Sequence, residues 1–279
     1  MNEPLSIVIL THNEADNLPR CLSSIVGFGE AVVVDSGSTD GTPEIAHEAG
    51  ARIYQHPFKS FAQQRNWALE NCDLNTSWVM FLDADEVVTP EFREAAAYAI
   101  QSANDSVAGF YCCWKMMIGS RWLRRSDSFP KWQFRILRPG RAMFIDSGHG
   151  QKEGAVKGEI RYIREPYLHY ALSKGWESWW AKHNQYSSEE AADRLTRAVS
   201  WSDLFAYDPS RRNRALKPLL SRIPAWPLWR FLHMYIFKGG FLEGCDGFSY
   251  CANIAWYEFL IRLKMAELQR RQETRPQSD

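Results

Sequence analysis

The sequence lacks the cysteine and histidine patterns of a disulfide-stapled or zinc-bound domain. Six cysteines occur among 279 residues, but no two of them form a C-x-x-C pair and no histidine cluster lies beside them. Secreted disulfide scaffolds and zinc modules both depend on such spacing. We therefore expect free thiols and a reducing, cytosolic environment.

Long apolar runs are missing as well. No stretch approaches the ~18 uninterrupted apolar residues of a spanning helix. The start, Met-Asn-Glu-Pro, has neither the basic nor the apolar segment of an export signal. We therefore expect a chain that stays in the cytoplasm and does not cross a membrane.

Two glycine-rich nucleotide-binding fingerprints are also absent. The sequence contains neither G-x-G-x-x-G nor G-x-x-x-x-G-K-[ST], the loops that hold dinucleotides and nucleoside triphosphates. Their absence counts against a nicotinamide-dependent enzyme and against a P-loop enzyme.

What is present is enough apolar material for a sizeable core, together with an uneven charge. Hydrophobic residues make up 45% of the chain, and the net charge is zero. Residues 1–100 carry fifteen Asp and Glu against five Lys and Arg, which leaves eighteen acids and twenty-eight bases in the remainder. This asymmetry indicates an acidic site in the first part and an anionic partner for the second.

The first hundred residues alternate between buried strands and helices. Apolar runs predict strands at 5–10, 31–34 and 78–82, with a short one at 52–54, and helical patterns follow each strand. This alternation predicts a mostly parallel, Rossmann-like α/β sheet flanked by helices. Ligands bind such sheets beyond the carboxyl ends of the strands, where Thr11, Asp35 and Asp83 collect.

The pattern changes after this region. Strands are predicted at 107–115, 133–137 and 167–170, and from Ser173 the pattern is helical, with a last clear helix at about 250–271. We therefore expect a sheet domain over residues 1–172 and a helical C-terminal extension over residues 173–279.

The strongest chemical signal is the sequence Leu82-Asp83-Ala84-Asp85-Glu86. In an extended segment alternate side chains share a side, so Asp83 and Asp85 would point the same way. Two carboxylates aimed at one point repel each other unless a cation lies between them. Mg²⁺ or Mn²⁺ would serve and would also bridge two phosphates. The alternative is an acidic turn at a strand end.

A second signal follows the strand at 31–34. Asp35 ends this strand, and a Ser/Gly turn leads to a helix start at Thr42-Pro43. An acid at a strand tip can accept hydrogen bonds from uracil or ribose, and glycine lets a base approach the backbone closely. The alternative is that the segment supplies only turn and capping interactions, as we expect for Asp40.

Four blocks together resemble glycosyltransferase family 2, the inverting enzymes of the GT-A fold. The blocks are residues 7–17, the Asp-Ser-Gly-Ser-Thr-Asp-Gly-Thr turn, Gln64-Arg65-Asn66 and the Leu-Asp-Ala-Asp-Glu segment. The Gln-Arg-Asn-Trp-Ala-Leu run and residues 238–244 look most like bacterial lipopolysaccharide-core glycosyltransferases of the WaaE/KdtX type. The resemblance covers the whole chain.

The resemblance implies nucleotide-binding roles for five residues: Thr11, Glu14, Asp35, Arg65 and Asp83. Thr11 and Glu14 would line the pocket, Thr11 through its backbone, and Asp35 would bind uracil or ribose. Arg65 would contact the base or a phosphate, with a helix-surface ion pair as its alternative. Asp83 would reach the ribose or the metal, and Asp85 would be the main ligand of Mg²⁺ or Mn²⁺.

An inverting transfer also needs a base that takes the proton of the acceptor hydroxyl. The candidates follow the Asp83 strand: Asp127, Asp146, His149, Glu153 and Glu165. Family members carry an adjacent His-Glu pair in this region, whereas this chain separates the two residues. We expect Glu153 to be the base and His149 to lie beside it, with ordinary loop roles as the alternative.

Three further polar residues have open roles. Arg135 and Arg138 could hold a diphosphate or an anionic acceptor, or they could be solvated residues at a sheet edge. His169 lies in a Tyr-Leu-His-Tyr segment that matches the family's pattern, and a lone histidine near a strand end is more often structural than catalytic.

The C-terminal third carries a basic and aromatic stretch. Between Pro209 and Leu242 there is no acid, and seven bases occur: Arg211, Arg212, Arg214, Lys217, Arg222, Arg230 and Lys238. Interleaved aromatic residues suit the surface of an anionic membrane. A solvated basic helix with an aromatic core face is the alternative. No RNA-binding signature accompanies the stretch, so we expect no nucleic-acid partner.

Together these patterns predict a metal-dependent, inverting glycosyltransferase. It would move a hexose from a nucleoside-diphosphate sugar, a UDP-hexose by resemblance, to a glycan or lipid-linked acceptor in lipopolysaccharide-core or other cell-envelope synthesis. We expect it peripherally on the inner face of the bacterial cytoplasmic membrane. Two alternatives stay open: a sugar nucleotidyltransferase, and a non-catalytic membrane-bound interaction module on the same fold.

Overall fold

The computed structural model describes residues 5–148, 150–196, 202, 215–216, 219–221 and 223–273. The chain divides into two compact units. One, the sheet unit, consists of Met1–Trp122 and Phe129–Lys174. The other, the helical unit, consists of Leu123–Ser128 and Gly175–Asp279 and is therefore discontinuous in sequence.

Within the described residues, the sheet unit contains a nine-stranded sheet in the order β3-β2-β1-β4-β8-β6-β11-β5, with β7 paired to β6. The strands are β1 (Leu5–Thr11), β2 (Glu30–Asp35), β3 (Arg52–Gln55), β4 (Trp78–Asp83), β5 (Glu86–Val87), β6 (Val107–Ile118), β7 (Arg121–Trp122), β8 (Trp132–Leu137) and β11 (Glu159–His169). A separate antiparallel pair joins β9 (Ala142–Ser147) to β10 (Gly150–Val156). Strands β3, β2, β1 and β4 are parallel neighbours, so the parallel α/β sheet predicted for the first hundred residues is confirmed.

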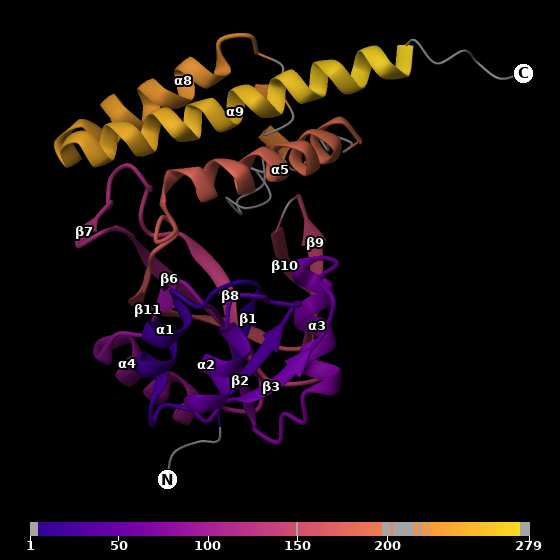
Figure 1. Ribbon diagram of the computed structural model, residues 1–279, viewed down its shortest axis with the longest axis vertical. Helices are drawn as coiled ribbons and strands as arrows, with labels where there is room; N and C mark the ends of the chain where they lie inside the picture. Colours follow the sequence, from indigo (N-terminus) through magenta and orange to yellow (C-terminus); the bar gives the residue numbers. More distant parts are fainter. Residues whose placement is uncertain are drawn as a thin grey trace, which may run out of the picture. The chain divides into compact units, whose positions relative to one another are not determined.

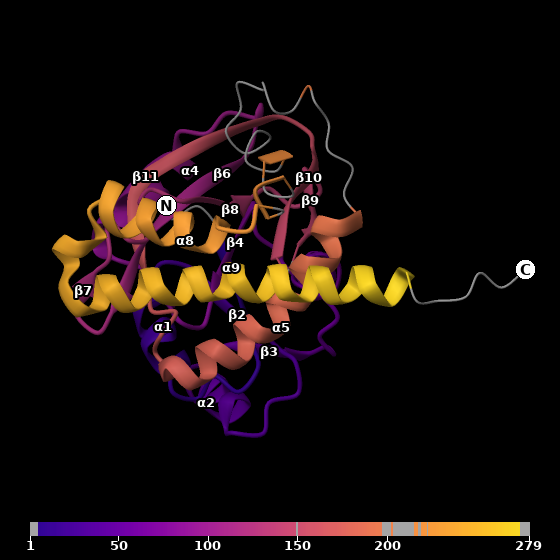
Figure 2. The ribbon, with the colours of Figure 1, turned by 90° about the horizontal axis from the view of Figure 1, so that it is seen from above.

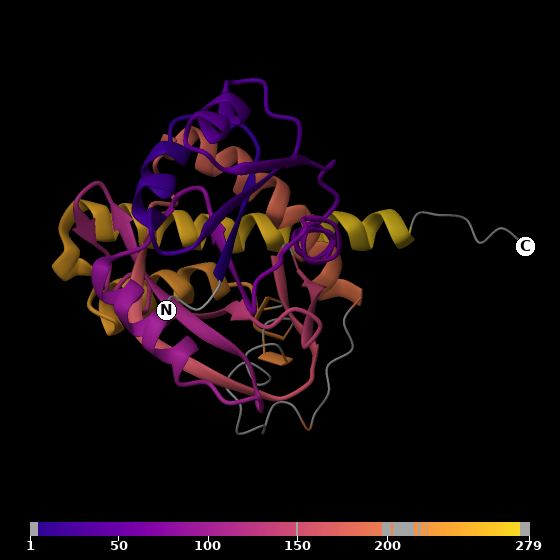
Figure 3. The same ribbon diagram turned by 90° about the horizontal axis from the view of Figure 1, so that it is seen from below.

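Four helices cover the two faces of this sheet: α1 (Leu18–Ile25), α2 (Thr42–Glu48), α3 (Phe61–Asn71) and α4 (Pro90–Gln101). Because successive side chains of a strand point to opposite faces, β1 contributes Ile7 and Ile9 to one apolar cluster and Val8 to another. The first cluster includes residues of α1, α2 and α4, and the second includes residues of α3 and β9. Figures 1 and 3 show the helices around the sheet.

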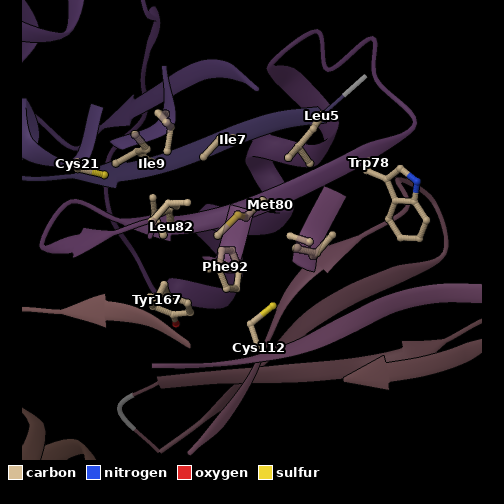
Figure 4. Packing of buried hydrophobic residues seen from close by; sticks show 14 of the residues in the cluster. Leu5, Ile7, Ile9, Cys21, Trp78, Met80, Leu82, Phe92, Cys112 and Tyr167 are labelled. Carbon is tan, nitrogen blue, oxygen red and sulfur yellow. The ribbon is translucent and has the colours of Figure 1, made fainter. Parts of the chain in front are cut away.

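The first of these clusters forms the main core. In Figure 4, Ile7 and Ile9 of β1 lie beside Met80 and Leu82 of β4, with Phe92 of α4 below them. All five side chains are buried. This packing holds the carboxyl ends of β1, β2 and β4 at one edge of the sheet. There Thr11 of β1 pairs with Asp35 of β2, and Leu10 of β1 pairs with Asp83 of β4.

The region after residue 107 differs from the prediction. The strand predicted at 167–170 ends a much longer strand, β11, which runs parallel to β6, and neither β9 nor β10 was predicted. The reason is composition, since β11 exposes much of its length and β10 reads Gly-Gln-Lys-Glu-Gly-Ala-Val. These strands carry little of the apolar signal by which a buried strand is recognised.

The helical unit contains α5 (Gly175–Thr196), α8 (Trp226–Leu232), a π-helical turn η1 (His233–Phe237), a 3₁₀ turn η2 (Gly240–Glu243) and α9 (Gly244–Glu273). Helix α9 packs against both α5 and α8 (Figures 1 and 2). Buried Arg194 joins α5 to α9, because its guanidinium binds both Glu190 of α5 at 3.0 Å and Glu258 of α9 at 2.8 Å. None of the helices in the described ranges has the length and apolar character needed to cross a bilayer.

The segment Leu123–Ser128 is held in the helical unit by buried polar contacts. The carboxylate of Glu243 accepts hydrogen bonds from the backbone N–H of Arg125 at 2.6 Å and from Ser126, at 2.9 Å from its N–H and 2.5 Å from its hydroxyl. Tyr250 of α9 donates its hydroxyl to Asp127 at 2.5 Å. We call this set of contacts the Glu243 latch.

Candidate active site at the end of strand β4

The loops that follow β1 and β2 are joined by a network centred on Asp35. The buried carboxylate of Asp35 accepts hydrogen bonds from the hydroxyl of Thr11 at 2.9 Å, from the N–H groups of Gly37 and Ser38 at 3.0 and 2.9 Å, and from the hydroxyl of Ser38 at 2.5 Å. A carboxylate offers about four lone-pair sites, so these four donors saturate it. In this structure Asp35 therefore shapes the loop, and its binding of uracil or ribose stays a prediction.

Glu14 and Asp40 extend the same network. The N–H of Glu14 donates to the hydroxyl of Thr42 at 2.8 Å, and the N–H of Ala15 donates to Asp40 at 3.1 Å. The Glu14 carboxylate lies 2.7 Å from the ammonium of Lys174. The two loops form one wall at the carboxyl edge of the sheet.

The Gln64-Arg65-Asn66 block of α3 makes three different sets of contacts. Consecutive helical residues point about 100° apart, so each side chain leaves the helix in its own direction. Gln64 donates to the hydroxyl of Ser36 at 3.1 Å, after β2. Asn66 makes two 2.8 Å hydrogen bonds to the backbone of Phe144 in β9. Arg65, between them, points to the end of β4.

Asp83, the last residue of β4, is held by two buried arginines. Its oxygens lie 3.3 Å from Nη2 of Arg65 and 2.8 Å from Nη2 of Arg135, and both arginine side chains are 1% exposed. Arg135 also lies 2.5 Å from Glu86, whose other oxygen accepts the backbone N–H of Asp83 at 2.9 Å. Helix α3 and strand β8 thus fix one carboxylate from opposite sides.

Four residues complete the surroundings of these arginines. Tyr167 of β11 lies 3.1 Å from Nε of Arg135. Gln151 of β10, with its amide oxygen turned toward Arg65, accepts from Nη1 at 2.7 Å and Nη2 at 3.2 Å. The Arg65 guanidinium also lies 5.2–5.3 Å from the ring centres of Phe81 and Phe144. This packing leaves Arg65 no exposed face, so its direct contact with a nucleotide stays a prediction.

The buried charges shift one another's pKa values. Burial alone would raise the pKa of Asp83, but the guanidiniums of Arg135 and Arg65 lower it well below its ordinary range. Burial and the like charge of Arg135 lower the pKa of Arg65 to about 10, which leaves it protonated at neutral pH. Burial raises the pKa of Glu86, against the opposing effect of Arg135. The cluster therefore keeps Asp83 ionised.

Asp85 lies in a turn and faces His169. Residues 84 and 85 form a turn between β4 and β5, so the expected extended alternation of Asp83 and Asp85 is wrong. Pairing of β5 with β11 sets His169 opposite Glu86, and Nε2 of His169 lies 3.6 Å from Asp85 Oδ1. Burial disfavours the charged imidazole, but Asp85 outweighs it and raises the pKa of His169 to about 9, so a metal bound by His169 would have to displace the proton from this ring.

Asp85 and His169 fit a divalent cation that the phosphates of a bound nucleotide would help to hold. Ligands of Mg²⁺ or Mn²⁺ sit about 2.1 Å from the ion, so two of them can lie at most about 4.2 Å apart, and the Asp85–His169 separation of 3.6 Å is within that limit. The buried Nδ1 of His169 makes no hydrogen bond. Within the described residues no group of three His, Cys, Asp or Glu side chains could enclose a metal. Phosphates and water would have to complete the coordination.

The β9–β10 hairpin carries the proposed base on the face that contacts α3. Phe144 pairs with Glu153, and Asp146 pairs with Gln151, so these four side chains share one face of the hairpin. Phe144 and Gln151 both contact Arg65. Glu153 is half-buried and Asp146 is exposed. His149 lies outside the described residues.

The other sequence candidates lie elsewhere. Asp127 is buried against Tyr250 in the helical unit, and Glu165 is exposed on β11. Arg138 stacks on Trp78 at the start of β4, at 4.3 Å, away from the carboxyl edge. The alternative in which Arg135 is a solvated edge residue is wrong, because β8 is an interior strand and Arg135 is bound to Asp83 and Glu86. Its binding of a diphosphate or an anionic acceptor stays a prediction.

Three residues of the site were not predicted, Glu86, Gln151 and Tyr167, and His169 was noted only with an open role. Glu86 carried a signal, since an acid directly after the Asp83-Ala84-Asp85 turn can reach back to the strand. The others depend on pairings of β10 and β11 that the sequence does not show.

The known proteins to which this chain is similar include glycosyltransferases. The family model described as glycosyl transferase family 2 matches residues 6–177. An uncharacterized glycosyltransferase of Rickettsia felis is 26% identical over 95% of this chain and 90% of its own length. The lipopolysaccharide core biosynthesis glycosyltransferase LpsC of Rhizobium meliloti is 26% identical over 94% of this chain and 92% of its own length.

Solved structures show weaker likeness. The crystal structure of S. aureus TarS 1–349 in complex with UDP superposes with a TM-score of 0.45 at 13% identity, over 98% of this chain and 93% of that one. Because the family model alone spans more than half of the chain, it decides the assignment. The chain belongs to glycosyltransferase family 2, and its α/β sheet unit is the GT-A domain of that family.

Proposed function

We propose that this glycosyltransferase moves a hexose from a UDP-sugar to a glycan or lipid-linked acceptor, with inversion at the anomeric carbon. The observation that carries the proposal is the charge cluster at the end of β4. Asp83 and Glu86 are neutralised by Arg65 and Arg135, whereas Asp85 faces His169. Asp83 and Glu86 thus have structural partners in the two arginines, and we assign Asp85, with His169, to the donor side.

The proposed metal site consists of Asp85 and His169, supported by the half-buried Asp83 that Arg65 and Arg135 hold in place. A bound Mg²⁺ or Mn²⁺ would neutralise the diphosphate that leaves. An imidazole ligand suits Mn²⁺ better than Mg²⁺, which prefers oxygen. We therefore infer a preference for Mn²⁺ and a metal affinity that rises when UDP is present.

The proposed base is Glu153, on the hairpin face that contacts Arg65. It would take the proton of the acceptor hydroxyl while that oxygen bonds to the anomeric carbon and the bond to the diphosphate breaks. Thr11, Glu14 and Asp35 would form the nucleotide wall, Asp35 through the loop that it shapes.

The acceptor and location belong to the same proposal. Similarity to a lipopolysaccharide-core enzyme over most of both chains supports an acceptor in the bacterial cell envelope. Such an acceptor would be presented at the inner face of the cytoplasmic membrane. Five bases of the predicted membrane stretch, Arg211, Arg212, Arg214, Lys217 and Arg222, lie outside the described residues.

Substitution of Asp85 tests the proposal. Asp85→Asn keeps the size of the side chain and removes the charge that a cation needs, so transfer from UDP-sugars with Mn²⁺ should fall by a factor of about 10² or more. Calorimetry should show that UDP no longer raises the affinity for Mn²⁺. Asp105→Asn, at an exposed acid of the same unit, should change neither. Full activity of Asp85→Asn, or of wild-type protein in excess EDTA, would refute the metal-dependent mechanism.

A further inference from the structure

The helical unit exposes large apolar side chains where η1, η2 and α9 follow one another. Phe237 and Leu242 are 72% and 62% exposed, and Phe241 and Phe248 are each 50% exposed. The ring of Tyr235 lies 6.3 Å from that of Phe241 and 5.6 Å from that of Phe248, which joins these three rings. We call the set the aromatic patch: Tyr235, Phe237, Phe241, Leu242 and Phe248.

Basic side chains accompany the aromatic patch. Lys238 lies between its residues in sequence, and Arg230 lies one turn before Met234 of η1. The guanidinium of Arg125 lies beside Gly239, so close that a β-carbon at Gly239 would be 2.9 Å from Nη1. Arg124 and Arg125 are both exposed. These four residues form the basic rim: Arg124, Arg125, Arg230 and Lys238.

The two acids that follow in sequence, Glu243 and Asp246, are less exposed than the bases Arg124, Arg125 and Lys238. Glu243 is buried, and its oxygens accept three hydrogen bonds from Arg125 and Ser126. Asp246 is half-buried in the first turn of α9. The Glu243 latch also fixes the backbone of Arg125, so the basic rim is held next to the aromatic patch by buried contacts.

Exposed apolar positions continue along α9. Trp256, Phe259 and Leu263 are all exposed. They follow Phe248 by eight, eleven and fifteen residues, so each lies within a quarter turn of Phe248 around the helix axis. A stripe of this kind, beginning at a basic and aromatic end, is the pattern of a helix that lies in a membrane interface.

We infer that the aromatic patch and the basic rim bind the surface of an anionic lipid bilayer, with the rings at the level of the headgroups. The inference extends the membrane location proposed above and rests on it. A second copy of the chain is the less favourable occupant. A two-fold dimer sets the same surface against itself, so the basic rims would face each other across the interface. An anionic bilayer complements both the charge and the apolar rings.

Cys245 allows a direct test, because it is exposed whereas the other five cysteines are buried. It lies in the first turn of α9, between Leu242 and Phe248. Full-length protein labelled there with an environment-sensitive fluorophore should show a blue shift with vesicles of phosphatidylcholine and phosphatidylglycerol. Vesicles of phosphatidylcholine alone should give a smaller shift, and nitroxide-labelled lipid should quench the probe.

Two double variants separate the apolar contribution to vesicle binding from the contribution of the charges. Phe237→Ser with Leu242→Ser, and Arg125→Glu with Lys238→Glu, should each weaken vesicle binding about tenfold or more. The matched controls lie on the sheet unit. Val26→Ser with Tyr98→Ser changes two side chains that are 73% and 74% exposed, and Lys59→Glu reverses an exposed charge. Both controls should bind vesicles as the wild type does.

Three results would overturn the inference: no vesicle binding by wild-type protein at any composition, vesicle binding unaffected by both pairs of changes, or a dimer that the Phe237 and Leu242 changes convert to a monomer. UDP binding in solution, measured on every variant, keeps this test apart from the transferase proposal. If the protein binds UDP with Mn²⁺ but does not bind vesicles, only the membrane-binding inference is wrong. If it binds vesicles but not UDP, only the proposed donor is wrong.

Discussion

Asp35 and Asp85 are both acids near the end of a buried parallel strand, yet their surroundings differ. Asp35 is fully buried and accepts four hydrogen bonds from its own and the neighbouring loop. Asp85 is partly exposed and faces an imidazole across 3.6 Å. At the residue scale, burial therefore separates an acid that shapes a loop from one that a ligand can reach.

Asp35→Asn tests the architectural role. An amide would set N–H groups against the N–H donors of Gly37 and Ser38, and leaving buried donors unsatisfied costs about 1–3 kcal/mol. We expect the free energy of unfolding in urea to fall by that amount. Asp16→Asn, at an exposed acid in the preceding loop, should leave it unchanged. If stability were unaltered while UDP affinity collapsed, Asp35 would contact the nucleotide directly.

Glu153→Gln tests the base. The change preserves shape and removes the proton acceptor, so UDP affinity should survive while turnover falls by a factor of about 10²–10⁴. The matched control is Asp146→Asn, because Asp146 shares the same face of the hairpin. A loss of turnover in Asp146→Asn but not in Glu153→Gln would transfer the role to Asp146.

At the scale of elements, α3 connects the nucleotide side to the acceptor side of the sheet unit. Its three consecutive residues reach the loop after β2, the end of β4 and strand β9. The Gln-Arg-Asn block is therefore needed as a unit, since each side chain has a partner that its neighbour cannot reach.

Asn66→Ala should loosen the β9–β10 hairpin. The change removes two hydrogen bonds to the backbone of Phe144, and we expect a loss of about 1–3 kcal/mol in unfolding free energy. Hydrogen exchange should accelerate at the amide of Phe144, and turnover should fall with Glu153 displaced. Asn71→Ala, which removes only a contact within α3, is the control. Unchanged exchange at Phe144 would show that the hairpin is held by its apolar contacts instead.

The elements differ in how far the sequence predicts them. The strands 5–10, 31–34 and 78–82 are buried on both faces, so each has a continuous apolar signal, and their register places Asp35 and Asp83 at one edge. Asp83 could be recognised from the sequence because it ends one of these buried strands. By contrast, His169 reaches Asp85 only because β11 pairs with β5, and Arg135 reaches Asp83 across 52 residues. Such pairings depend on long-range packing, which local patterns do not encode.

At the scale of the whole chain, the Glu243 latch explains a block that resemblance noted without a role. Residues 238–244 supply the carboxylate of Glu243 and also Gly240, where a β-carbon would lie 3.0 Å from the Ser126 hydroxyl, and Gly247 follows this block. A β-carbon at Gly247 would lie 2.2 Å from the carbonyl oxygen of Gly240. The block is therefore a socket for Leu123–Ser128.

Glu243→Ala should destabilise the helical unit. It leaves three donors of Arg125 and Ser126 without their acceptor, so we expect a loss of about 3 kcal/mol or more in unfolding free energy. The melting temperature should fall, while Glu243→Gln should retain part of the stability because its amide oxygen still accepts. Glu267→Ala, at an exposed acid of α9 that pairs with the exposed Arg271, is the control. Equal stability of Glu243→Ala and Glu267→Ala would show that the latch contributes nothing.

The latch also imposes an order on biosynthesis. Ser126 and Glu243 are separated by 117 residues, and a ribosome that adds about 5–20 residues per second needs about 6–23 seconds to make that interval. During this time Leu123–Ser128 has been synthesised and its flanking strands can pair, but its acceptor does not yet exist. The nascent sheet unit must therefore leave this segment open until the last helix emerges, and a chain that stalls before residue 243 would expose it to proteases.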